Sequence, residues 1–237
     1  MKQGLPAALI ILSAAISIYG QDRWQTKHNP RPDQATTSAA PIASNSSDPV
    51  KYTYEFSQPK FYVKHIVLEH DANGRGTVTF ERLNEDASVV EPLQLSAAAL
   101  SRINTAWQAL QFLDSAADYQ ADKQFPHLGT MRIGMERGTQ KRVAEFNWTN
   151  NTDASTLASE YRKAADQAIL IFDISVARQN QPLNAPKLME AMESLLKRNA
   201  LSDPQQLLPL LNELTTDERI PLIARNHAGR LIKKIQK

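Results

Sequence analysis

Hydrophobic residues alternate with polar ones in several short stretches of the chain, and this spacing of two is typical of strands with one buried face. The stretches are rich in Val, Ile, Thr, Tyr and Phe, which strands favour. They cover residues 51–56, 61–70, 77–83, 130–136 and 142–148. Turn residues separate the second stretch from the third and the fourth from the fifth, so these four predict two hairpins.

The first hairpin turns within residues 71–74, where an Asn-Gly pair between two strand-like runs is a strong hairpin signal. With this pair at the centre of a two-residue turn, Val67 would face Phe80 on the buried side of the sheet. The same register places His70 at an exposed tip. Replacing this histidine by Ala would then cost less than about 0.5 kcal/mol.

Apolar residues recur at spacings of three and four in five other stretches, which predicts helices with one buried face. They cover residues 96–113, 153–178, 186–195, 204–214 and 221–235. Ser96 offers an N-cap for the first of these helices, and the polar cluster at 150–153 offers one for the second. A proline begins each of the other three.

This order of strands, helix, strands, long helix and helical tail predicts an α+β fold, because the strand pairs are joined by hairpins and not by helical crossovers. We expect an antiparallel sheet of about four to five strands packed by two helices and followed by a C-terminal helical tail. The expected organisation is a signal segment at 1–20, a disordered linker at 21–49, an α+β domain at 50–183 and a C-terminal helical subdomain at 184–237 packed on it.

The N-terminus has the pattern of an export signal. A short, weakly positive start is followed by an uncharged run of 15 residues at 5–19. A helix needs about 20 apolar residues to cross hydrocarbon, so we expect cleavage after Gly20, with an uncleaved inner-membrane anchor as the alternative. The protein would then be exported, periplasmic or secreted, with no further transmembrane segment. The Pro-rich residues 22–49 hold few large apolar side chains and predict a disordered tether.

Composition removes several classes of chemistry. The chain has no cysteine, so it forms no disulfide and offers no thiolate nucleophile or cysteine metal ligand. The 27 basic and 25 acidic residues leave a net charge of +2, too small for an overall attraction to nucleic acid. No phosphate-binding, dinucleotide or zinc-protease motif occurs, and a calcium loop starting at Asp71 fails because its last position is Arg82. We therefore expect no cofactor and no metal site.

Two histidines are candidates for acid–base chemistry. Glu69 and Asp71 flank His70, but neighbouring residues on a strand point to opposite faces, so neither carboxylate would hold the ring. His127 lies in a predicted loop before a strand, where it could line a pocket. A hydrolase-like enzyme using one of these histidines with an acidic partner is the alternative function. The scattered positions favour a non-catalytic protein, because an active site brings several polar residues together.

Four short motifs carry a family resemblance: FPHLGT at 125–130, EFNWT at 145–149, NQPL at 180–183 and PLIARNHA at 221–228. On the basis of these motifs, the chain from about Lys51 to its C-terminus resembles an uncharacterised family of exported bacterial proteins with no assigned function. Its C-terminal part, from 207 to 237, resembles a single HEAT-like helical hairpin. The resemblance implies an exported protein but supplies no catalytic or binding residue.

The last predicted helix carries the candidate binding site. Six basic residues and one acidic residue lie between 218 and 237, although the whole chain is nearly neutral. The expected buried stripe of this helix consists of Ile223, Ala224, Ala228, Leu231 and Ile235. The predicted partner-binding residues are Arg225, Arg230, Lys233 and Lys234.

Such a basic stripe would bind an acidic surface of another envelope protein or an anionic surface such as lipid headgroups. The alternative is structural, because cations near a helix C-terminus are favoured by the helix dipole. The sequence therefore predicts an exported envelope protein of the interaction or structural type, with the hydrolase-like enzyme as the alternative.

Overall fold

The structure, a computed structural model, describes residues 48–237. The predicted signal segment and nearly all of the predicted linker lie outside the described residues. The described residues belong to one compact unit. Among the described residues, no helix is both long enough and apolar enough to cross a membrane.

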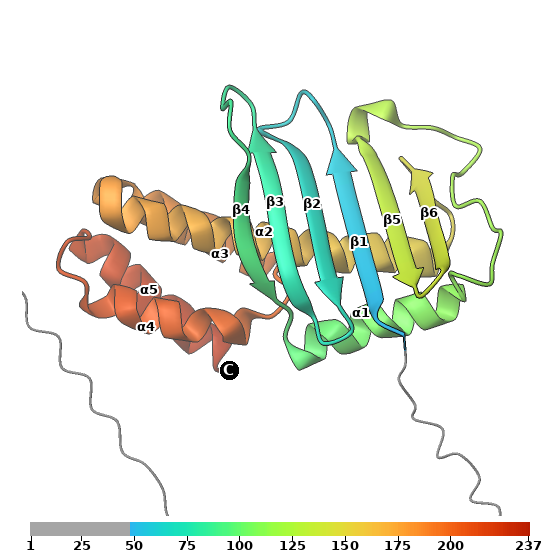
Figure 1. The fold of residues 1–237 in the computed structure, drawn as a ribbon. Coiled ribbons are helices and arrows are strands. Elements are labelled where there is room, and N and C mark those ends of the chain that lie inside the picture. The colour runs from blue at the N-terminus through green and yellow to red at the C-terminus, as the bar shows by residue number, and fades with distance from the viewer. Residues whose placement is uncertain (1–47) are drawn as a thin grey trace, which may run out of the picture. The chain divides into compact units, whose positions relative to one another are not determined.

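One antiparallel sheet of six strands forms the framework (Figure 1). Its strands are β1 (Val50–Ser57), β2 (Val63–Asp71), β3 (Arg75–Arg82), β4 (Val89–Gln94), β5 (Thr130–Arg137) and β6 (Gln140–Phe146). They lie in the order β4-β3-β2-β1-β5-β6. The predicted α+β class is confirmed, and the sheet has one strand more than the four to five expected.

The additional strand, β4, contains Pro92 and was not predicted from the sequence. Proline cannot donate a backbone hydrogen bond, so it argues against a strand in the middle of a sheet. At the edge of this sheet β4 pairs only with β3, where Pro92 lies opposite Thr77. The proline is tolerated there because an edge strand has one unpaired side.

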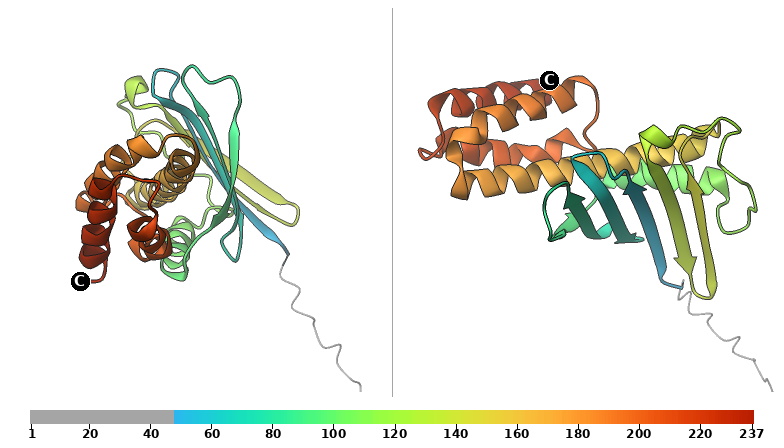
Figure 2. Two further views of the ribbon diagram at one scale, coloured as in Figure 1. Left: turned by 90° about the vertical axis from the view of Figure 1, so that its left-hand side faces the viewer. Right: turned by 90° about the horizontal axis from the view of Figure 1, so that it is seen from above.

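Five α-helices of the described part of the chain accompany the sheet. Helices α1 (Ala97–Leu110) and α2 (Thr152–Asn180) cross one face of it, and three further helices continue past β4 (Figure 2). The side chains of Ser96 and Asn151 accept the N–H groups of Ala99 and Ala154, so both predicted N-caps are confirmed. The later helices are α3 (Ala185–Lys197), α4 (Leu208–Thr216) and α5 (Leu222–Ile235), with short 3₁₀ turns at Pro126–Leu128, Pro182–Asn184 and Pro204–Leu207.

The long helix α2 belongs to two hydrophobic cores. Its buried residues from Ala154 to Ile169 pack with α1 and the sheet, and we call this cluster the sheet core. Leu170 and Ile174, further along α2, pack instead with α3, α4 and α5 in a cluster that we call the helical core. Because α2 is continuous, it ties the three C-terminal helices to the sheet.

The first hairpin has a register that differs from the prediction. Gly74 has a φ of 74°, and its N–H bonds the carbonyl of Asp71, so the turn is longer by one residue than a two-residue turn. His70 therefore pairs with Gly76, and Phe80 pairs with Ile66 rather than facing Val67. A shift of one residue moves every side chain of a strand to the other face. The predicted burial of Val67 and exposure of His70 are both wrong for this reason.

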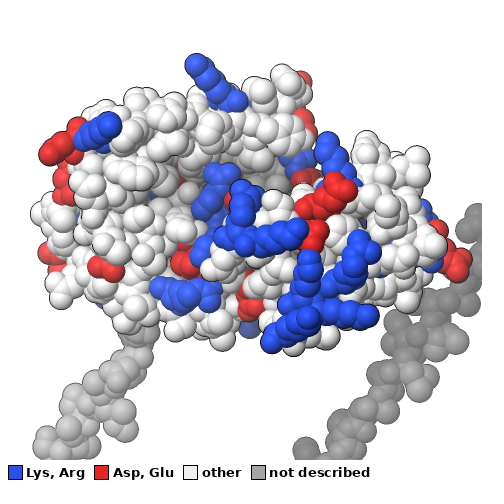
Figure 3. Space-filling view, turned by 180° about the vertical axis from the view of Figure 1, so that it is seen from behind, with Lys and Arg blue, Asp and Glu red and all other residues white. Residues whose placement is uncertain are grey.

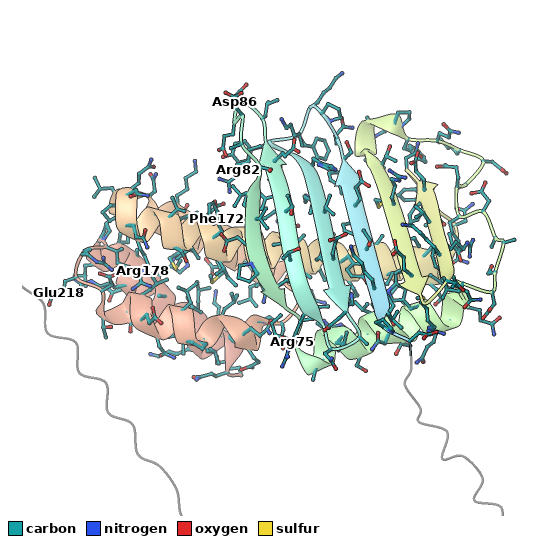
Figure 4. All side chains as sticks on the ribbon, in the orientation of Figure 1. Arg75, Arg82, Asp86, Phe172, Arg178 and Glu218 are labelled. Atoms are coloured by element: carbon teal, nitrogen blue, oxygen red, sulfur yellow. The ribbon has the colours of Figure 1, made fainter. Side chains whose placement is uncertain are left out.

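Arg82 joins the end of β3 to α2 (Figure 4). It is 8% exposed and forms an ion pair with Asp173. Its guanidinium also lies 5.6 Å from the ring centroid of Phe172 and 5.0 Å from that of Phe80. A buried charge needs a partner of opposite charge, and Asp173 provides it.

Candidate functional site: a basic surface on the helices

The predicted partner-binding residues lie on α5. Four of the five residues assigned to its buried stripe are buried, from Ala224 to Ile235, but Ile223 is 65% exposed. Ile223 fits the helical spacing, yet it lies in the first turn of α5, and spacing alone does not determine how far the neighbouring helices extend. Its predicted burial is therefore wrong.

The four basic residues differ in their surroundings. Arg230 and Lys233 are exposed, and Lys234 is exposed but paired with Glu193 of α3. Arg225 is half-buried, and its Nε atom is buried without a hydrogen-bond partner among the described residues. Arg230, Lys233 and Lys234 are thus accessible to a partner, whereas Arg225 is partly enclosed.

Glu193 links α3 to α5. Besides Lys234 it contacts Lys197 at 3.4 Å and the Nε2 atom of His227 at 3.2 Å. The hydrogen bond from Lys234, together with Lys197, lowers the pKa of Glu193 to about 2. The carboxylate therefore stays ionised and holds the surrounding cations in defined positions.

A second carboxylate, Glu160 of α2, has the same arrangement. It is 5% exposed and accepts from Arg102 at 2.7 Å and from Lys163 at 2.8 Å. Burial opposes its ionisation, but the hydrogen bonds from Lys163 and Arg102 outweigh burial, so the pKa of Glu160 is lowered. Arg102 also donates to the carbonyl of Ser202 at 2.6 Å, which brings α1 against the segment after α3.

Lys and Arg side chains gather in the middle and lower right of the face of the molecule that Figure 3 shows. Burial raises the pKa of Asp166 of α2, and the charges of Arg162 and, to a smaller extent, of Arg198 at the end of α3 partly oppose this rise. We use the name basic surface for the cations paired with Glu160 and Glu193, together with Arg198 and the exposed cations of α5: Arg102, Lys163, Lys197, Arg198, Arg230, Lys233 and Lys234. Sequence reasoning found only the α5 members, because the others come from α1, α2 and α3.

The candidate histidine His70 lies inside the sheet core. It is 2% exposed, and its Nδ1 atom lies 2.7 Å from the carbonyl oxygen of Asp71, so Nδ1 must donate. Its Nε2 atom therefore accepts from the hydroxyl of Tyr161 at 2.8 Å, and Tyr161 accepts in turn from the indole of Trp107 at 2.9 Å. Burial lowers the pKa of His70, which keeps the ring neutral.

No carboxylate among the described residues hydrogen-bonds the ring of His70 or of His127. The Asp71 carboxylate accepts the backbone N–H groups of Asn73 and Arg75 at 2.8 and 3.0 Å, and His127 is exposed in a 3₁₀ turn. The structure thus does not bring either histidine together with an acidic side chain in the way that the hydrolase-like alternative requires.

A third histidine does contact carboxylates. The Nε2 atom of His65, on the open face of the sheet, lies 3.0 Å from Glu55, and its Nδ1 atom lies 3.5 Å from Glu81. Both ring nitrogens of His65 thus face carboxylates of the neighbouring strands β1 and β3. This arrangement is a cross-strand network of polar side chains. The described residues contain no group of three or more His, Asp or Glu side chains that could hold a metal ion.

Comparison of the chain with known proteins adds no relative to this description. No model of a protein family matches the sequence. No curated protein matches it either.

Proposed function

We propose that the protein is an exported, non-catalytic interaction module of the cell envelope that binds an acidic protein partner through the basic surface. The observation that supports this proposal is the gathering of seven cations from four helices on a chain whose net charge is only +2. Local positive charge of this kind attracts an anionic partner and speeds its association.

The choice of an acidic protein surface rests on the two glutamates within the basic surface. Glu160 and Glu193 hold their cations by ion pairs. A fixed arrangement of cations suits carboxylates at matching positions on a folded partner, whereas mobile lipid headgroups need no such pattern. The hydrolase-like alternative gains no support from the contacts of His70 and His127.

The test compares binding of a simple acidic polypeptide, poly-L-glutamate, by two charge-reversed variants. In the first, Arg230, Lys233 and Lys234 are replaced by Glu. In the second, a matched control, the same change is made at Lys60, Arg75 and Arg137, which are exposed and form no ion pair among the described residues. Circular dichroism establishes that both variants are folded.

We expect the α5 variant to lose at least about tenfold in affinity at low salt, and the control to stay within about twofold of the parent. Binding should weaken as ionic strength rises, because exposed charges are screened over about 10 Å at 0.1 M salt. Equal losses in the two variants would show that only net charge matters and would contradict the proposal. Tighter binding to phosphatidylglycerol vesicles than to poly-L-glutamate would replace the protein partner by a lipid surface.

A further inference from the structure

A groove lies on the side of the sheet that faces α2, far along the chain from the α5 cations. Two of the motifs noted in the sequence meet beside it, at 125–130 and 145–149. The N–H of Phe125 donates to Asn147 at 3.0 Å, and the rings of Phe125 and Trp148 contact each other edge to face with their centroids 5.3 Å apart. Phe146, Trp148 and Thr149 of the second motif line the groove.

The floor of the groove is a row of apolar side chains across three strands. Phe56 of β1 pairs with Met131 of β5, which pairs with Phe146 of β6. Gly129 lies next to Phe56 with a φ of 93°, and a side chain there would start 2.8 Å from the ring of Phe56. Glycine is thus required for the backbone to pass this close to the floor.

The opposite wall comes from the first turns of α2. The residues that line the groove there are Ser155, Ala158 and Ser159, at the spacing of three and four that places them on one helix face. Their small side chains leave a space of about 280 Å³ above the aromatic floor. Trp148 stands at the side of this space and is 45% exposed.

One cation lies at the groove. Arg162 of α2 places its guanidinium 4.6 Å from the ring centroid of Phe56, over the floor. Its Nε atom donates to Asp166 at 2.9 Å. The two terminal nitrogens form no hydrogen bond with any described residue, so the planar fork of the guanidinium is free to take a carboxylate by two parallel hydrogen bonds.

We propose that this groove binds a small amphipathic monocarboxylate. Its apolar body would lie on Phe56, Met131 and Phe146 beside Trp148, and its carboxylate would bond the terminal nitrogens of Arg162. The volume is at the lower end of the range of small-molecule pockets, which limits the body to one aromatic ring or a short alkyl chain. The lining of this groove contains no residue of the basic surface, and the site does not depend on the proposed function.

The test uses phenylacetate and its uncharged analogue phenylacetamide, titrated into the protein while the indole N–H resonance of Trp148 is followed by NMR. We expect the resonance to shift and the carboxylate to bind at least about fivefold more tightly than the amide. Replacing Arg162→Gln should reduce this preference to less than about twofold. The same change at Arg230 of the basic surface should leave the preference intact.

A second variant tests the groove without touching the charge. Ser159→Leu fills the space from an exposed position of α2, and Ser175→Leu is the matched control at an exposed position of the same helix outside the groove. Binding of both probes should weaken at least about tenfold in the first and stay unchanged in the second. Equal affinity for the two probes, a preference that survives Arg162→Gln, or unchanged binding in Ser159→Leu would each overturn the proposal.

Discussion

The sheet core and the helical core share α2 but differ in chemistry. The sheet core contains nine buried aromatic side chains: Tyr52, Tyr54, Phe56, Phe80, Trp107, Phe112, Tyr119, Phe146 and Tyr161. The buried members of the helical core within the described chain are Leu, Ile, Met and Ala only. An aliphatic core is specified mainly by spacing and volume. A core with buried polar atoms must also satisfy their hydrogen bonds, so it fixes the orientation of each ring.

The hydrogen-bonded chain from Trp107 through Tyr161 to His70 is an example of buried polar atoms that must be satisfied in the sheet core. It runs in one direction, because the indole can only donate and the carbonyl of Asp71 can only accept. The ring of His70 also stacks on Tyr52, with centroids 4.9 Å apart. Within residues 48–237, no comparable polar chain joins the buried members of the helical core. The predictions below therefore contrast a polar change in the sheet core with a matched change elsewhere.

The largest effect is expected for His70→Ala. This change removes a buried ring and leaves the hydroxyl of Tyr161 without its acceptor, so we expect a loss of about 3 to 4 kcal/mol in the free energy of unfolding. The control is His65→Ala on the open face of the same strand, which should cost less than about 1 kcal/mol. Urea denaturation measures both. Equal losses of unfolding free energy in the two variants would mean that the face of β2 on which a histidine lies does not affect stability. That result would contradict the observed register.

A somewhat smaller effect is expected for Tyr161→Phe, which removes a single oxygen atom. Both Trp107 and His70 lose their partner, and each unsatisfied buried group costs at least about 1 kcal/mol, so a loss of at least about 2 kcal/mol in the free energy of unfolding is expected. Met192→Leu in the helical core changes the shape of a whole side chain but leaves no polar group behind. It should lower the free energy of unfolding by less than about 1.5 kcal/mol. A larger loss for Met192→Leu than for Tyr161→Phe would contradict the contrast between the two cores.

Acidic pH should destabilise the protein through His70. Burial lowers the pKa of His70 below its ordinary value of 6.5, so the unfolded chain takes up a proton at a higher pH than the folded protein does. Between these two pKa values the unfolded state binds more protons, and stability falls as pH decreases below about 6.5, by up to about 1.4 kcal/mol per pH unit.

Buried carboxyls with raised pKa values, Asp166 and Asp173, act in the opposite direction. The contribution of His70 is therefore measured as the difference between the parent and His70→Ala in urea denaturation at pH 5 and pH 7. The difference should shrink at pH 5. If the difference in unfolding free energy is the same at pH 5 and pH 7, then His70 has the same protonation in the folded and the unfolded protein, contrary to this prediction.

The smallest effect is expected on the basic surface. Replacing Arg230, Lys233 and Lys234 by Gln removes one exposed ion pair, and exposed pairs contribute about 0 to 1 kcal/mol. We expect thermal unfolding of this variant to differ from that of the parent by less than about 1 kcal/mol. A loss of several kcal/mol would mean that these cations stabilise the helical core and are not available to a partner.

Much of the fold was readable from local patterns. The five predicted helices are present near their expected positions, and Ser96 and Asn151 act as the predicted caps. Five strands were recognised by alternation, and β4 was missed because Pro92 is acceptable only at an edge. Of the basic surface, only the α5 part was found, because spacing along one helix carries no information about cations on α1, α2 and α3.

The sequence by itself determined most of the helices and strands, because alternation in strands and the spacing in helices depend only on residues that are near one another in the chain. The tertiary structure decided which face each element turns inward, and the hairpin at 71–74 shows why. One additional residue in the turn, made possible by the positive φ of Gly74, reverses the faces of β2 and buries His70 against Tyr161, 91 residues further along the chain. The basic surface and the groove at Arg162 depend in the same way on contacts between distant segments, which no local pattern encodes.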